Sequence, residues 1–256
     1  MPELYNLSAL ASALGRGGRH VALVSQIDAQ RDTASRMTDL SHAVELVAQL
    51  AEVHSTPGRL FQSGVLWDAF SNVQGALFAQ ALILYGRATE RPDPKRPLCF
   101  DLEAVVTSDE LAAHRRLRTV RDRAIAHVDS EARQDWHTNV LVLLMGDDGT
   151  WRFRAPHNRT SYNTATFRDL QTSLETALKA GAAFGHRALL ALGAALDAAL
   201  KEDPRLKAVL ENCVFDAQGY FGTSAEATSA IAAMLRDDEG MVVWNTQVSK
   251  PPTMGA

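Results

Sequence analysis

Apolar residues at helical spacing cover most of this sequence and restrict it to a mainly α-helical fold. They recur every three to four positions over 32–54, 59–89, 108–128 and 167–201, which is the spacing of one face of an α-helix. The stretch 59–89 is apolar on nearly every face, so it is predicted to be the buried central helix. We therefore expect a bundle of about four main helices.

One β pattern interrupts the helical stretches. An apolar run at 140–145 is followed by Asp148-Gly149 and then by Trp151-Arg152-Phe153-Arg154. An Asp-Gly pair between two such runs is typical of a β-hairpin turn. The sequence thus predicts a hairpin inserted into the bundle at about 139–154.

The helical pattern also predicts how the chain is divided. Residues 1–31 form an N-terminal segment with a short helix near 4–14, residues 32–202 form the helical domain, and residues 203–256 form a C-terminal extension with a strand near 241–244. Hydroxyl and acidic residues mark helix starts. We therefore expect one helix to begin at Ser108 as its N-cap. Two others should begin at capping boxes, one of Thr166 with Asp169 and one of Thr223 with Glu226.

Composition and missing motifs exclude several classes of protein. The 256 residues are 46% hydrophobic with a net charge of −4, which excludes a disordered chain and a globally basic nucleic-acid coat. The N-terminus lacks a signal-peptide pattern, and the long uncharged run 69–86 contains polar residues, so we expect a cytoplasmic protein without membrane contact. The sequence has no phosphate-binding glycine loop, and its histidines lack metal-ligand spacing, so no cofactor and no metal are expected.

An arginine-rich stretch late in the third helical range carries the functional information. Five arginines lie within 115–123, and the apolar positions 113, 117, 120, 124 and 128 form a stripe along the same range. On a helix Arg121 and His127 would flank this stripe, each roughly 60° from its middle and about 9 Å apart along the axis. A group packed over the stripe would meet a cation on one side and an imidazole on the other.

This pairing suits cleavage of a phosphodiester without a metal. A histidine titrates near neutral pH and can move the proton of a ribose 2′-hydroxyl or of a leaving oxygen. An arginine stabilises the charge on the phosphate. On helix geometry alone, a histidine at a core edge and a solvated, salt-bridged arginine face would explain the same residues.

The string Arg121-Asp122-Arg123-Ala124-Ile125-Ala126-His127 resembles the signature of the HEPN superfamily, in which a polar residue follows the arginine and a histidine follows after a short gap. With Val128-Asp129 it is similar to the Arg-Asp-Lys-x-Ile-Ala-His-x-Asp form of abortive-infection members. The resemblance covers roughly 32–202. It implies a helical bundle that is usually a homodimer, and in many members a metal-independent endoribonuclease of a defence or toxin–antitoxin system.

The resemblance implies a catalytic set of Arg121 and His127, with Asp122 orienting or polarising. Backbone contacts to RNA are expected from Arg115, Arg118, Arg123, Arg152 and Arg154, although a solvated strand face is the commoner explanation for the last two. An antitoxin or a nucleotidyltransferase is the expected protein partner, but Asp129 stands where some members carry a tyrosine that a nucleotidyltransferase modifies. Two alternatives stay open: a non-catalytic HEPN-like module that binds RNA, a nucleotide or a protein, and a structural bundle whose arginines form salt bridges.

Overall fold

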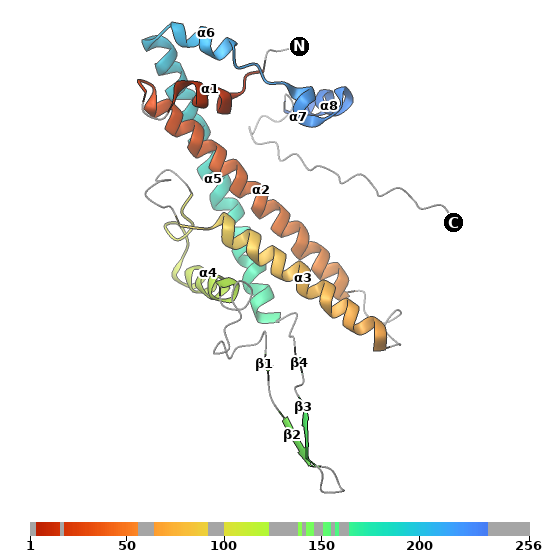
Figure 1. Ribbon diagram of the computed structural model, residues 1–256. Helices are drawn as coiled ribbons and strands as arrows, with labels where there is room; N and C mark the ends of the chain where they lie inside the picture. The colour runs from red at the N-terminus through yellow and green to blue at the C-terminus, as the bar shows by residue number, and fades with distance from the viewer. Residues whose placement is uncertain are drawn as a thin grey trace, which may run out of the picture. The chain divides into compact units, whose positions relative to one another are not determined.

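The computed structural model consists of α-helices of very different lengths and a few short strands (Figure 1). The described residues are 4–15, 18–55, 64–91, 100–122, 138–139, 142–145, 151–154, 157–158 and 164–234. Eight α-helices lie within them. The prediction of a mainly α-helical protein is confirmed.

Two compact units make up the chain, one formed by residues 35–184 and the other by residues 1–34 together with 185–256. The sequence instead predicted divisions after residues 31 and 202. The unit boundaries fall inside the continuous helices α2 (Val21–Ser55) and α5 (Thr164–Glu202). No loop or change in composition marks them, so the sequence pattern could not locate them.

The unit 35–184 is built on parts of α2 and α5, on α3 (Gly64–Ala88) and on α4 (Ser108–Val120). Each of these helices buries apolar side chains in the core of the unit. The largest fully buried side chains of this unit are Leu40, Leu50, Phe78, Leu82, Tyr85, Leu102, Leu117, Leu170 and Leu174. In α2 the apolar residue Val44 is exposed, whereas its neighbour Ala43 is buried.

A buried arginine links α2 to the end of α3. The Arg36 guanidinium donates hydrogen bonds to the carbonyl oxygens of Ala88 at 3.0 Å and Glu90 at 2.7 Å. The last carbonyls of a helix lack partners within the helix. Arg36 therefore supplies from α2 the donors that the C-terminus of α3 needs.

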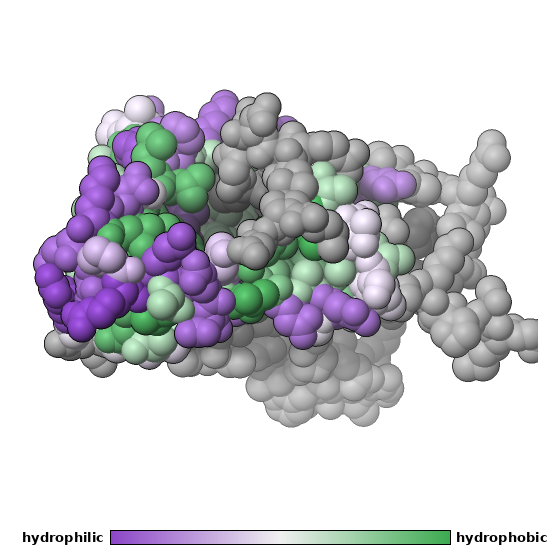
Figure 2. Space-filling model, turned by 90° about the horizontal axis from the view of Figure 1, so that it is seen from above, coloured by the Kyte–Doolittle hydropathy of each residue, from purple (hydrophilic) through white to green (hydrophobic). Residues whose placement is uncertain are grey.

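The unit 1–34 with 185–256 contains α1 (Leu7–Leu14), α6 (Arg205–Glu211), α7 (Ala217–Phe221) and α8 (Ser224–Met234). Its core joins distant parts of the sequence, with Leu10, Leu23, Ile27, Leu192 and Leu206 all buried in one cluster. The predicted capping box of Thr223 and Glu226 is confirmed by reciprocal hydrogen bonds. Hydrophobic residues are interspersed with hydrophilic ones on the face of the molecule shown in Figure 2.

The described residues between α4 and α5 form four short strands. Strand β2 (Val142–Met145) pairs antiparallel with β3 (Trp151–Arg154), with Val142 opposite Arg154 and Met145 opposite Trp151. Strand β1 (Thr138–Asn139) pairs antiparallel with β4 (His157–Asn158).

Three predicted helix boundaries were wrong. The helix α2 begins at Val21, well before residue 32, because the partners of its first turns lie in α1, α5 and α6. Thr107 rather than Ser108 is the N-cap of α4, since only Thr107 has a glutamate, Glu110, three residues later. The helix α5 begins at Thr164, so Thr166 lies inside it. The strand expected at 241–244 lies outside the described residues.

In the described part of the chain, α5 is long and apolar enough to cross a membrane by length and composition, with 22% of the relevant window buried. Core helices of water-soluble proteins share this composition. The cytoplasmic location stays a prediction from the sequence.

Candidate functional site

The arginine-rich helix α4 begins at a capping box. Glu110 donates its backbone N–H to the Thr107 hydroxyl at 3.4 Å, and its carboxylate accepts the Thr107 backbone N–H at 2.9 Å. Asp109 and Glu110 also place negative charge at the positive end of the helix dipole. The Glu110 carboxylate further accepts a hydrogen bond from Thr176 of α5 at 2.9 Å. Local sequence and packing on α5 therefore fix where α4 starts.

The buried face of α4 differs from the predicted stripe. His114 and Leu117 are the buried side chains of this helix, whereas Ala113 and Val120 are only partly buried. At about 100° per residue, a face centred between His114 and Leu117 includes the Arg121 position. Arg121 therefore lies on the packed side of α4 and not at its edge, which corrects the prediction. Partners outside α4, described below, cause this rotation.

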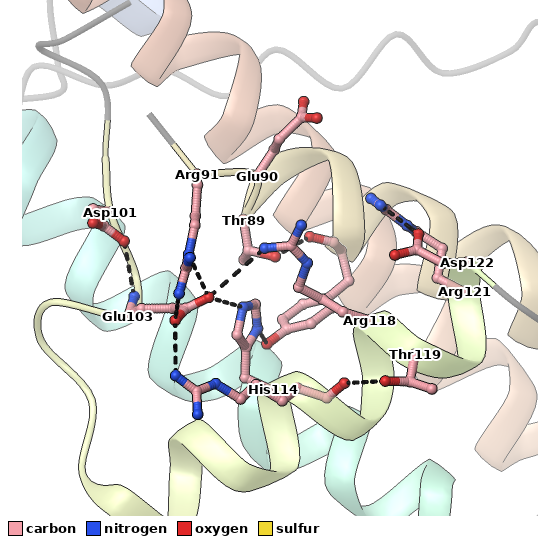
Figure 3. Close-up of polar contacts among 12 residues, drawn as sticks. Thr89, Glu90, Arg91, Asp101, Glu103, His114, Arg118, Thr119, Arg121 and Asp122 are labelled. Atoms are coloured by element: carbon pink, nitrogen blue, oxygen red, sulfur yellow. Dashed lines mark hydrogen bonds and ion pairs between the residues drawn. The ribbon is translucent and has the colours of Figure 1, made fainter. Parts of the chain in front are cut away.

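Arg121 follows the last residue of α4 in helical backbone conformation and lies against α3 (Figure 3). Its side chain is 21% exposed, and its Nε donates to Asp122 Oδ1 at 2.7 Å. A Cβ atom placed on Gly86 of α3 would lie 2.7 Å from Arg121 Nη1 and 3.0 Å from its Nε. The Arg121 guanidinium thus lies directly over Gly86, with Asp122 beside it.

Arg118 lies one helical turn before Arg121 and is also half-buried, at 26% exposed. Its nearest partner in the described residues is Glu103, with 3.7 Å between Nη1 and Oε1. That separation is too long for a hydrogen bond. A guanidinium carries five N–H donors, so Arg118 keeps most of its donor capacity for another acceptor.

Glu103 is the centre of a charged group that we call the Glu103 cluster, formed by Glu103, Arg91, His114, Arg115 and Arg118. Figure 3 labels all of these residues except Arg115. The Glu103 carboxylate is 12% exposed and accepts two hydrogen bonds from Arg91, one of them at 2.8 Å. Arg115 Nη2 lies 3.5 Å away and His114 Nε2 lies 3.8 Å away. These contacts, led by the Arg91 hydrogen bonds, lower the pKa of Glu103. One carboxylate therefore faces three guanidinium groups, which leaves the cluster with excess positive charge.

His114 is 1% exposed and belongs to a buried chain of polar groups. Its Nδ1 lies 2.7 Å from the Tyr85 hydroxyl of α3, and Tyr85 also forms a hydrogen bond with Ser173 of α5. Burial lowers the pKa of His114, although Glu103 opposes that effect, and burial raises the pKa of Tyr85. Within the part of the chain that the structure describes, His114 Nε2 has no hydrogen-bond partner. This geometry fits a neutral His114 whose Nδ1 accepts a hydrogen bond from the Tyr85 hydroxyl.

The sequence pattern gave His114 no role, although its spacing from Leu117 indicated that it would be buried. His114 lies three residues before Leu117, which the pattern placed in the core. Residues three apart share a helix face. The burial of His114 depends on Tyr85 and Glu103, which come from other parts of the chain.

The structure brings some of the predicted site residues together. Arg121 and Asp122 are in contact, and Arg115 and Arg118 both face Glu103. Arg152 and Arg154 lie on β3, but their side chains are outside the described part, as are Arg123 and His127 entirely. The neighbouring Arg116 forms an exposed pair of hydrogen bonds with Asp169 of α5, which matches the salt-bridge interpretation for that residue.

The described arrangement is suited to binding an anion. Two half-buried guanidinium groups lie one turn apart on the same face of α4, and a bidentate guanidinium matches the oxygen spacing of a phosphate. In the residues described, no cluster of three or more histidine, cysteine, aspartate or glutamate side chains could hold a metal.

Comparisons of the chain with models of protein families, with curated proteins and with solved structures find no match. The resemblance to the HEPN superfamily therefore rests on the 121–129 string and its helical context.

Proposed function

We propose that this chain is a metal-independent endoribonuclease with a HEPN-like fold, acting in a defence or toxin–antitoxin system. Its substrate is RNA, and the protein acts as a cytoplasmic homodimer with an antitoxin or a nucleotidyltransferase as its partner. The observation that carries the proposal is the placement of Arg118 and Arg121. Their guanidinium groups are half-buried and lie one turn apart at the C-terminal end of α4.

In this proposal Arg121 binds the phosphate that is cut. Asp122 holds the Nε and Nη2 side of the guanidinium, so the remaining N–H groups are available to phosphate oxygens. The charge on those oxygens grows in the transition state, where a pre-positioned donor acts most strongly. Arg118 and Arg115 bind the neighbouring phosphate, and Arg123, Arg152 and Arg154 contact the RNA backbone further away.

His127 moves the protons of the reaction. It removes the proton of the ribose 2′-hydroxyl as the 2′-oxygen bonds to phosphorus, and the bond from phosphorus to the 5′-oxygen breaks. The leaving 5′-oxygen takes a proton, from the same imidazole or from that of the second copy in a dimer. The products are a 2′,3′-cyclic phosphate and a 5′-hydroxyl.

The test is RNA cleavage by purified protein in EDTA, comparing wild type with Arg121→Ala and His127→Ala. Arg116→Ala is the matched control, because Arg116 lies on the same helix but forms an exposed pair with Asp169. Loss of Arg121 is expected to lower the rate by about 10²–10³-fold. The rate of Arg116→Ala should stay within twofold of wild type. The product ends, read by mass spectrometry, should be 2′,3′-cyclic phosphates.

Two results would overturn the proposal. Equal cleavage by wild type and both variants would place the activity elsewhere or in a contaminant. Absence of cleavage by folded wild type over a panel of RNAs would favour the non-catalytic module, and binding of the same RNAs by Arg121→Ala and wild type would then identify it.

A further inference from the structure

Gly86 stands out among the glycines of the described helices because an arginine side chain occupies its empty side. The three atoms nearest to an added Cβ all belong to Arg121, namely Cδ, Nη1 and Nε. Gly193 in α5 is the opposite case, with no atom within 4 Å of an added Cβ. Gly86 is also buried and lies next to Tyr85, the partner of His114.

A glycine inside a helix is unfavourable for folding, because it loses more backbone freedom than any other residue. Alanine at position 86 would remove that cost. It would also collide with the Arg121 guanidinium, since separations below 3.0 Å are not tolerated between such atoms. The glycine is therefore explained by the side chain that lies over it.

We propose that Gly86 is a positioning residue for Arg121: its missing side chain creates the space in which the guanidinium lies beside Asp122. The role of this position in RNA cleavage rests on the function proposed above, whereas the placement of Arg121 over Gly86 does not. The atoms in collision are at the far end of a flexible side chain. Gly86→Ala should therefore displace the Arg121 guanidinium and leave the helices folded.

The first experiment measures RNA cleavage by Gly86→Ala, with Gly193→Ala as the matched helix-glycine control. Displacing the guanidinium from the transition state should lower kcat by about 10²-fold, close to the effect of Arg121→Ala, with little change in KM. Gly193→Ala should keep the wild-type kcat. Combining Gly86→Ala with Arg121→Ala should lower kcat no further than Arg121→Ala alone, because both changes remove the same interaction.

The second experiment needs no activity. The Nε–H signal of Arg121, identified in nitrogen-15 NMR spectra by its absence from Arg121→Ala, should shift in Gly86→Ala and stay in place in Gly193→Ala. In the Arg121→Ala background, where the collision is gone, Gly86→Ala should raise Tm by about 2 °C. With Arg121 present the same substitution should give less than half of that rise.

The two experiments separate the two proposals. An unmoved Arg121 signal and an equal rise in Tm in both backgrounds would overturn the role of Gly86, even if wild type cleaves RNA. A shifted signal and a background-dependent Tm would support that role, and absence of cleavage by wild type would then overturn the ribonuclease function alone. Cleavage by Gly86→Ala at the wild-type kcat would also overturn the positioning role.

Discussion

Replacing His114 by asparagine should make the stability of this protein less sensitive to mild acid. His114 is 1% exposed, and burial lowers its pKa in the folded state. Glu103 raises that pKa again, whereas Arg118, Arg91 and Arg115 act with burial, and Tyr85 holds the other ring nitrogen. Between the folded pKa and the ordinary value of about 6.5, the unfolded chain binds a proton at this site that the folded chain does not.

The sign and size of the change in stability with pH follow from this difference in bound protons. Because the unfolded state holds more protons in this window, stability is present above pH 6.5 and is lost as the pH falls. The free energy of unfolding should drop by up to about 1.4 kcal/mol between pH 7.5 and 5.5, the limit that applies when the folded state binds no proton at this site. For a chain of this size that corresponds to roughly 3–6 °C in Tm. Glu103 does not contribute there, because its pKa is lowered from its ordinary value of 4.5 and it stays ionised.

The assay is thermal unfolding of wild type and His114→Asn at pH 7.5 and 5.5 in one buffer. Asparagine keeps an oxygen acceptor near the Nδ1 position for the Tyr85 hydroxyl and cannot titrate. The other histidines are present in both proteins, so the difference between the two pH dependences isolates His114. An equal fall in Tm for both proteins would refute the assignment of a buried, neutral His114.

Two further predictions concern the packing of α4. Tyr85→Phe should lower the free energy of unfolding by about 1–3 kcal/mol, because it leaves the buried His114 Nδ1 without its hydrogen bond; urea unfolding measures this, and an unchanged midpoint would contradict the contact. Leu117→Ala removes a fully buried side chain and should cost about 2–5 kcal/mol in the same assay, whereas a loss below about 1 kcal/mol would mean that α4 is not packed as described.

The sequence predicted the helices of this protein better than their contacts. Periodicity located α3 and the middle of α2, because apolar spacing reflects which face is buried. It missed the first turns of α2, where Leu23 and Ile27 pack with Leu192 and Leu206. Those partners are more than 160 positions away, so no local pattern reports them.

The candidate site was predicted in part for a similar reason. The residues Arg121 and Asp122 were found from a local string, and their contact is local. The rotation of α4 that buries Arg121 depends on Gly86 of another helix, and the burial of His114 depends on Glu103. The spacing of apolar residues cannot reveal that His114 is buried with polar partners from other segments. It also cannot reveal that Arg121 lies over Gly86.

The buried polar contacts of α3 differ in their response to acid. Arg36 holds the end of α3 through backbone carbonyls, and neither an arginine nor a carbonyl changes charge in mild acid. His114 contacts Tyr85 of α3 from α4, and its imidazole gains a proton in mild acid when local opening exposes it to water. We therefore expect acid to weaken the packing of α4 on α3 before it weakens the contact between α2 and α3. The helix that carries Arg118 would then loosen before the helices that support it.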